Sequence, residues 1–471
     1  MSAALLIDFG STYTKLRAID LERRCVLGAG QGPSTVASDI TIGMQAALAD
    51  LERHLGALPR FKYRLASSSA AGGLRMITIG LVRELTAEAA RQAALGAGAK
   101  LVGSFAYRLT AADLETITRL APDIMLLAGG TDGGNSEVIL HNARALAAHR
   151  VSCPIVYAGN RNAADEAATL LAGSTLITTA NVMPEFNVLD IESARAAIRK
   201  VFIDRIVHAK GIDRASAEFD QVLMPTPAAV MEGARLIADG CATAGGLGEL
   251  MVVDPGGATT DVHSVATGEP QTAGAIRRGL PEPRVKRTVE GDLGMRHNAA
   301  AIVEAAGAEA IAREAGLPVP RIAALVENYA RAVEHLPDNA DELALDGALA
   351  RAAVKAAVAR HCGYLETVYT VNGPVAVQQG KDLSALKTVI GTGGALAHGR
   401  DPRVVLGMAL ADPAAPQSLR PRAPRLLVDC DYLLYACGLL GAVEPEIALE
   451  LALKHLIPAD DAQPHERTLS A

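Results

Sequence analysis

The stretch LLIDFGSTYTK at residues 5–15 indicates the fold most strongly, because a similar stretch, MVVDPGGATTDV, occurs about half a chain later at residues 251–262. Each copy begins as an apolar run typical of a buried strand, reaches an aspartate, turns through glycine and hydroxyl residues, and resumes β-type residues. A carboxylate at a strand end can hold a hydrated divalent cation, and glycines let backbone N–H groups approach an anion. Two such turns predict a polyphosphate that is held from both sides, so a nucleotide is the first hypothesis for the ligand.

The residues between and after the two copies predict alternating strands and helices. The runs DIMLLAGG at 123–130 and PIVYAGN at 154–160 are apolar strands that end in glycine turns, as in a parallel sheet covered on both faces. We therefore expect an α/β fold of two lobes, each opening with a β-hairpin. The expected parts are a first lobe at 1–180, a helical connection or insertion at 181–248, a second lobe at 249–457 with a helical insertion at about 299–361, and a polar tail at 458–471.

The composition excludes several classes of partner. The 471 residues carry a net charge of −7, only 3% are aromatic and none is Trp, which argues against nucleic acid and against an anionic membrane surface. The apolar run at 432–443 is too short to span a bilayer, and the first residues lack the pattern of a secretory signal. The six cysteines form no CxxC pair, as expected of a reduced, cytoplasmic protein.

The first copy supplies one half of the predicted site. Gly10, Ser11 and Thr12 can offer backbone and hydroxyl donors to phosphate oxygens, and Lys15 can add a positive charge. Asp8 would hold Mg²⁺, largely through water, and would orient an attacking water or hydroxyl.

The second copy supplies the other half. Gly256 and Gly257 would hold the opposite edge of the phosphates, and Thr259 would donate a hydrogen bond. Asp254 would be a second Mg²⁺ ligand, again largely through water, and Asp261 would complete the metal or water site. Phosphoryl transfer needs positioning, charge neutralisation and a poised water, so these residue types suffice in kind. The expected catalytic residues are therefore Asp8, Asp254 and Asp261.

Two further glycine segments belong to the prediction. After a strand at 388–390, the residues Gly391, Thr392, Gly393 and Gly394 would let a purine and its ribose lie against the backbone. The segment GGTDGG at 129–134 follows a buried strand and reads as either a tight loop or part of the nucleotide site. We favour the site, and we expect Gly129 and Gly130 to contact the nucleotide.

The sequence lacks the motifs of several other nucleotide-binding and catalytic sites. The chain contains no G-x-x-x-x-G-K-[ST] loop, no complete dinucleotide fingerprint and no G-x-S-x-G elbow. One Asp-x-Gly turn alone is more often an Asx turn than a nucleotide site, but two in register reverse those odds. The run Asp261-Val262-His263 is similar to a loop that supplies a histidine to cobalamin, yet its glycine comes two positions late. We therefore expect His263 to be an ordinary strand residue.

The three glycine elements together resemble the phosphate-1, phosphate-2 and adenosine motifs of the actin, heat-shock-70 and sugar-kinase ATPase superfamily. They occur in the expected order, with Ala258 as the departure from the all-glycine second loop of the heat-shock proteins. This resemblance implies two actin-like, or ribonuclease H-like, lobes that bind ATP with Mg²⁺ in an interdomain cleft.

Three other stretches resemble one narrower family. They are ASSSAAGGLRM at 66–76, LAGGTDGGN at 127–135 and NVMPEFNVLDI at 181–191. Together they are similar to the MutL-like accessory proteins of glutamate mutase, which share only a name with the mismatch-repair protein. The resemblance covers nearly the whole chain and implies an ATP-hydrolysing chaperone that reactivates or assembles an adenosylcobalamin-dependent mutase. It therefore implies mutase subunits as partners and leaves self-association open.

Two alternatives on the same fold remain. A small-molecule kinase would use Asp8 or Asp261 to deprotonate a substrate hydroxyl, and the phosphate motifs alone do not distinguish it from a chaperone. An ATP-driven electron donor of the 2-hydroxyacyl-CoA dehydratase type would carry closely placed cysteines, whereas the cysteines here are dispersed. The scarcity of aromatic residues for stacking on a sugar favours a protein partner.

Overall fold

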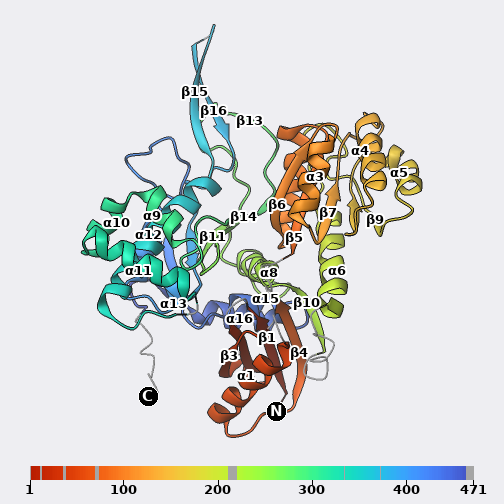
Figure 1. The fold of residues 1–471 in the computed structure, drawn as a ribbon. Helices are drawn as coiled ribbons and strands as arrows, with labels where there is room; N and C mark the ends of the chain where they lie inside the picture. The colour runs from red at the N-terminus through yellow and green to blue at the C-terminus, as the bar shows by residue number, and fades with distance from the viewer. Residues whose placement is uncertain are drawn as a thin grey trace. The chain divides into compact units, whose positions relative to one another are not determined.

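A computed structural model of the protein describes residues 2–10, 13–35, 39–68, 74–209, 220–333, 335–371 and 373–462 (Figure 1). Its contacts divide the chain into two compact units. Unit 1 comprises residues 1–230 and 279–283, and unit 2 comprises residues 231–278 and 284–471.

The first sheet of unit 1 begins with an antiparallel meander. Strands β1 (Ala3–Phe9), β2 (Tyr13–Asp20) and β3 (Cys25–Pro33) form it, and β4 (Phe61–Ser68) and β10 (Gln221–Pro225) extend it in parallel, so the order is β10-β4-β1-β2-β3. Helix α1 (Ile40–Leu55) lies close against β3, because a Cβ on Gly30 or Gly32 would overlap the backbone of α1.

A second sheet of unit 1 is inserted between β4 and β10. All its neighbouring strands are parallel, and the order β6-β5-β7-β8-β9 reverses direction between β5 and β7. The strands are β5 (Arg75–Gly80), β6 (Lys100–Ala106), β7 (Ile124–Leu127), β8 (Ile155–Tyr157) and β9 (Leu176–Thr178). Short helices connect them, namely η1 (Arg83–Ala87), α2 (Glu88–Gly96), α3 (Ala111–Leu120), α4 (Glu137–Ala148), η2 (Arg161–Ala163) and α5 (Ala164–Leu170). Helix α6 (Glu192–Ala209) follows, and one apolar core runs beneath both sheets.

Unit 2 repeats the strand order of the first sheet. Its sheet has the order β14-β12-β11-β17-β18-β19, in which β11, β12 and β14 are antiparallel and β17 and β18 join in parallel. The strands are β11 (Leu250–Pro255), β12 (Thr260–Val265), β14 (Val285–Glu290), β17 (Thr388–Gly391), β18 (Arg425–Asp429) and β19 (Leu456–Pro458). The expected duplication therefore extends from the two hairpins to five strands of each sheet.

Helices occupy the stretch where a helical insertion was expected, at 299–361. They are α9 (Ala299–Ala306), α10 (Ala308–Ala315), α11 (Val319–Arg331) and α12 (Ala340–His361), and they pack on the same core as β11 and β12. The other helices of unit 2 are α13 (Gly394–Ala397), α14 (Pro402–Gly407), α15 (Leu434–Leu440) and α16 (Pro445–His455). A small sheet of β13 (Ile276–Arg278), β16 (Gly373–Gln379) and β15 (Tyr364–Thr370) carries a projecting two-stranded arm (Figure 1).

The boundary between the units lies later than the expected end of the first lobe at residue 180. The reason is β10, which pairs with β4 and so returns the chain to the first sheet before helix α8 (Thr226–Asp239) begins. At the other end, Ala459 is buried, and residues 463–471 of the expected tail lie outside the described residues. Among the described helices, none combines the length and apolar character needed to cross a membrane.

Candidate functional site

The two glycine hairpins share the same cross-strand pairing and the same closing hydrogen bond. In β1 and β2, Asp8 pairs with Lys15 and the Gly10 N–H donates to the Tyr13 carbonyl at 3.0 Å. In β11 and β12, Asp254 pairs with Asp261 and the Gly256 N–H donates to the Thr259 carbonyl at 2.9 Å. Each turn therefore closes two residues after an aspartate, and each aspartate faces its cross-strand partner.

Asp8 lies at the buried end of β1 in unit 1. Its Oδ1 accepts the Thr226 hydroxyl at 2.5 Å, and the Ser67 hydroxyl lies 3.4 Å from the same oxygen. Burial raises the pKa of Asp8, while the Lys15 ammonium and the hydrogen bonds from Thr226 and Ser67 act in the opposite direction. Asp8 is thus a carboxylate held between hydroxyls and close to one ammonium.

The prediction from sequence missed Thr226 and did not single out Ser67. Thr226 is 218 residues from Asp8, and only the return of β10 to the first sheet brings it there. Ser67 could have been identified if β4 had been predicted to run parallel to β1, because that pairing places Ser67 beside Asp8. Of the other predicted groups in this turn, Lys15 is half-buried, and Ser11 and Thr12 lie outside the described residues.

The second turn is accessible at its tip. Gly257 is exposed, and Gly256 and Thr259 are half-buried. The carbonyls of Gly256 and Gly257 face a loop at 291–298, which donates N–H groups from Met295, Arg296 and His297 at 2.9–3.0 Å. That loop supports the turn from one side and leaves the tip open.

Unit 2 brings the third glycine segment directly against the second turn. Gly391 pairs with Val253 in the neighbouring strand, and a Cβ on Gly393 would overlap Oδ1 of Asp254. Gly393 also has φ of 87°, which only glycine adopts freely. The phosphate-2 and adenosine motifs of the prediction are therefore neighbours in space, and Gly394 begins α13 beside them.

Two of the predicted residues make interior contacts. Asp261 is buried and forms an ion pair with Arg287 of β14 at 2.8 Å, a partner that the sequence did not reveal. Thr392 is also buried, and its hydroxyl donates to Asp429 at 2.9 Å. Asp429 in turn accepts N–H groups at the start of α15, so it fixes the end of β18.

A pocket of 310 Å³ opens beside the third glycine segment. Its volume is at the lower end of the range for small-molecule sites, which is about 300–1,000 Å³. Its lining includes Gly394 and His398, together with residues of α12 such as Asp346 and Arg351. Arg351 pairs with Glu314 at 2.8 Å, and this carboxylate also lines the pocket.

Gly129 and Gly130 lie in the second sheet of unit 1, not in the sheet that carries Asp8. They follow β7 at the point where the strand order reverses, an edge at which open α/β sheets often bind ligands. Their carbonyls are occupied by the Asn160 N–H at 3.0 Å and the Asn181 side chain at 2.9 Å. Contact of this loop with a nucleotide stays a prediction.

His263 is a buried residue of β12, as expected of an ordinary strand residue. Burial, with a smaller contribution from the Arg287 charge, lowers its pKa to about 4.

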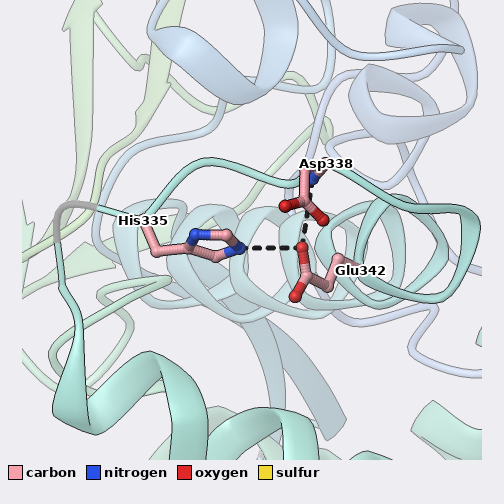
Figure 2. Close-up of side chains that lie close together, drawn as sticks. All are labelled: His335, Asp338 and Glu342. Atoms are coloured by element: carbon pink, nitrogen blue, oxygen red, sulfur yellow. Dashed lines mark hydrogen bonds and ion pairs between the residues drawn. The ribbon is translucent and has the colours of Figure 1, made fainter.

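A further group in unit 2 has metal-ligand chemistry. The ligand atoms of His335, Asp338 and Glu342 lie within 4.8 Å of one another (Figure 2). The contacts are those of a helix cap, because Glu342 in the first turn of α12 accepts the Asp338 N–H at 3.1 Å and His335 Nε2 at 2.8 Å. Asn339 completes the cap by accepting the Glu342 N–H.

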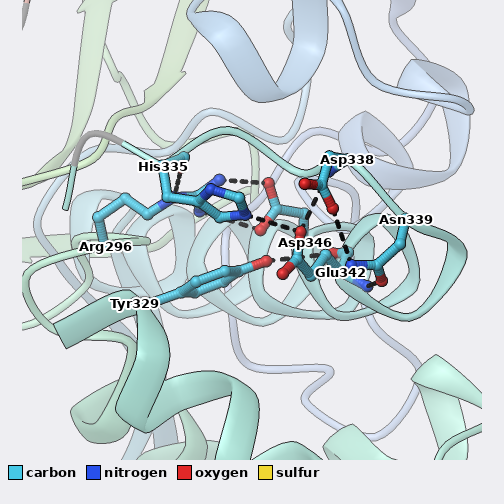
Figure 3. A network of polar contacts seen from close by, with 7 residues as sticks. All are labelled: Arg296, Tyr329, His335, Asp338, Asn339, Glu342 and Asp346. Carbon is cyan, nitrogen blue, oxygen red and sulfur yellow. Dashed lines mark hydrogen bonds and ion pairs between the residues drawn. The ribbon is translucent and has the colours of Figure 1, made fainter. Parts of the chain in front are cut away.

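Figure 3 shows that this cap belongs to a wider polar network. Arg296 pairs with Asp346 through contacts of 2.9 and 2.6 Å, donates to the His335 carbonyl and lies 4.3 Å from the Tyr329 ring. The network connects the loop behind the second glycine turn to Asp346 of the pocket wall, so it holds that wall in place.

Glu342→Gln is expected to destabilise unit 2 by about 1–2 kcal/mol at pH 7, because it weakens buried, charge-assisted hydrogen bonds. Burial alone would raise the pKa of Glu342, but hydrogen bonds from His335 and Asp338 outweigh it and hold the pKa below its ordinary 4.5. The stabilisation is therefore complete above pH 4.5 and is lost as pH falls through the lower folded-state value. Urea unfolding between pH 3 and 8 should show the two proteins converging in acid, with the exposed Glu304→Gln as control; a constant difference would contradict the cap.

The carboxylates at the second hairpin fit a Mg²⁺ ion bound through water. Asp254 and Asp261 are cross-strand partners and offer the hard oxygen ligands that Mg²⁺ prefers. Among the described residues, Oδ1 of buried Asp261 has no hydrogen-bond partner, and a metal-bound water would satisfy it.

The fold and these hairpins define a class of protein. Each unit contains a sheet with the strand order of a ribonuclease H-like fold, and the first two strands of each sheet form the same aspartate–glycine hairpin, so the expected actin-like α/β fold is confirmed. The family model described as MutL protein matches residues 4–456, and a Protein MutL from Clostridium tetanomorphum is 46% identical over 460 residues, covering 97% of this chain and 100% of that protein. The chain therefore belongs to the MutL protein family, the glutamate mutase accessory family that is unrelated to mismatch repair.

Solved structures show only weak likeness. A glycerol dehydratase reactivase has a TM-score of 0.32 and 11% identity, over 93% of this chain and 99% of its own. A xylulose kinase from Bifidobacterium adolescentis has a TM-score of 0.31 and 11% identity, over 95% of this chain and 93% of its own. These scores are too low to support a conclusion, so the fold class rests on the strand orders.

Proposed function

We propose that this protein binds and hydrolyses ATP with Mg²⁺, and that it uses this reaction to reactivate or assemble an adenosylcobalamin-dependent mutase of the glutamate mutase type. The observation that carries the proposal is the repeated hairpin, with its aspartate at the strand end, in a chain of the glutamate mutase accessory family. A cytoplasmic location is part of the proposal and is supported by the six cysteines, which are dispersed along the sequence and form no CxxC pair.

The residues divide into three roles. Bound Mg²⁺ would supply charge neutralisation at the phosphates, and Asp8 and Asp254 would hold it through water. Asp261 would complete the water network. The phosphate contacts would come from Gly10, Ser11, Thr12, Lys15, Gly256, Gly257 and Thr259.

The pocket beside Gly394 is the proposed site of the base and ribose. It adjoins the Gly391–Gly394 segment, and that segment lies against the Asp254 carboxylate, so base and phosphate contacts would be close together in unit 2. Arg351 and Arg400 in the lining offer guanidinium planes on which a purine can stack.

The β15–β16 arm supports a protein partner. Tyr369 is 84% exposed and Val371 is 102% exposed, and Glu366 is the only charged residue between 364 and 379. An exposed hairpin with a single charged residue is typical of an interaction surface rather than a solvated one.

Tyr369→Ser combined with Val371→Ser is expected to weaken binding to the mutase about 10-fold or more, because exposed aromatic anchors carry much of an interface's energy. ATP turnover of the protein alone should not change. Surface plasmon resonance with immobilised mutase measures the first quantity and phosphate release the second. Equal affinity of the double variant and of the exposed control Val404→Ser for the mutase would show that the arm is not part of the interface.

The function itself is tested by ATP turnover under three conditions. The protein is assayed alone, with candidate metabolites, and with a mutase that has been inactivated by hydroxocobalamin. Stimulation by the inactivated mutase, together with recovery of mutase activity, is the expected result. Stimulation by metabolites alone would replace this function with that of a small-molecule kinase.

A further inference from the structure

The Asp8 carboxylate is fixed on one side by groups from two other elements. Thr226, the first residue of α8, donates its hydroxyl to Oδ1 at 2.5 Å, and Ser67 of β4 lies 3.4 Å from the same atom. Asp8, Ser67 and Thr226 are 2%, 0% and 7% exposed, so bulk water does not replace these contacts.

The Thr226 and Ser67 hydroxyls both contact Oδ1 of Asp8, whereas Oδ2 lies near Gly10. The Thr226 hydroxyl has a single proton, and its 2.5 Å contact with Asp8 is much shorter than its 3.3 Å contact with Ser67. Oδ2 faces the glycine turn, because a Cβ on Gly10 would lie 3.6 Å from it. The hydroxyls therefore set the rotation of the carboxyl group about its Cβ–Cγ bond.

The sheet determines where both hydroxyls stand. Parallel pairing places Ser67 beside Asp8, and β10 pairs Pro225 with Ser68, so that Thr226 follows immediately at the end of the strand. A position on a strand or at the start of a helix that directly follows one is more rigid than a position in a loop, and a group that orients a reacting carboxylate needs that rigidity.

We propose that Thr226 is the positioning residue of Asp8, with Ser67 in a supporting role, and that it keeps Oδ2 directed at Gly10. The inference rests on the proposed ATPase function, because it assigns Thr226 to the same reaction. Thr226 acts through Asp8 and has no direct contact with the nucleotide.

Thr226→Val removes the hydroxyl at nearly constant volume, and Thr226→Ser keeps it. Loss of a group that orients a metal-binding residue costs about 10–100-fold, so kcat of the valine variant should fall by that factor. The Mg²⁺ concentration for half-maximal turnover should rise, while KM for ATP should change little. Thr226→Ser should stay within about threefold of the unmodified protein, and Ser67→Ala should show a smaller loss than Thr226→Val.

Thr78→Val is the matched control, because Thr78 is a buried threonine of unit 1 that bonds Ser104 at 3.1 Å and has no role in the site. Thermal unfolding of every variant separates misfolding from mispositioning. A folded Thr226→Val protein with unchanged kcat and Mg²⁺ dependence overturns the inference, and so does a folded Thr226→Ser protein that is as impaired as the valine variant. If the unmodified protein shows no Mg²⁺-dependent turnover, the proposed function fails and the inference fails with it; turnover in the unmodified protein leaves the variants to decide the inference alone.

Discussion

Asp254→Ala is expected to lower Mg²⁺-dependent ATP turnover by roughly 100–1,000-fold, the usual effect of removing one preorganised electrostatic group from a reacting centre. Asp254 is half-buried at the end of β11, faces Asp261 across the hairpin and lies against Gly393. Asp261, its cross-strand partner, is not expected to take its place, because the Oδ2 atom of Asp261 is paired with Arg287. Phosphate release measured over a range of Mg²⁺ concentrations gives the result.

Asp8→Ala should cause a loss of similar size, and both variants should remain folded. Asp165→Ala is the control, since this aspartate is an exposed residue of helix α5, which connects β8 and β9 of the second sheet. Circular dichroism confirms the fold, and binding of a fluorescent ATP analogue separates lost affinity from lost chemistry. Full turnover in both Asp8→Ala and Asp254→Ala would contradict the assignment of these hairpins to ATP.

Arg287→Met is expected to destabilise unit 2 by roughly 3–5 kcal/mol, which is the typical cost of leaving one member of a buried ion pair without its partner. The Arg287 and Asp261 side chains are 4% and 10% exposed, and Asp261 already has one oxygen without a hydrogen bond among the described residues. Losing Arg287 would leave a buried carboxylate with little compensation. Urea unfolding followed by circular dichroism measures the change.

The double variant Asp261→Asn with Arg287→Met separates structure from catalysis. Removing both charges should recover most of the lost stability, because neither partner then remains buried alone. If Asp261 takes part in the reaction, the stable double variant should still hydrolyse ATP poorly. Arg403→Met, which breaks an exposed pair with Asp460, should change stability by less than about 1 kcal/mol. A similar effect of Arg403→Met and Arg287→Met would show that burial does not govern this pair.

The hairpins were predictable because their determinants are local. An apolar run, an aspartate and a glycine two positions later specify where the strand ends and how the chain reverses, within about ten residues. The helices at 299–361 were predictable for the same kind of reason, since their alanine-rich sequence favours helix before any tertiary contact forms.

The unit boundary was harder to predict. Residues 181–248 read as mostly helical, yet this stretch contains β10, a strand of five residues. Its place is determined by the free edge of β4, and no pattern within five residues reveals which strand a segment will pair with.

The two hairpins, the glycine segment at 391–394 and the family resemblance were predictable without a structure, because they depend on residues that are neighbours along the chain. The tertiary structure alone decided that Thr226 contacts Asp8, that Gly393 lies against Asp254 and that Arg287 neutralises Asp261. Each of these contacts joins residues that are 26 to 218 positions apart. They form because strand pairing and burial bring separate segments together, and a buried carboxylate must then find its donors among whichever side chains the sheet supplies.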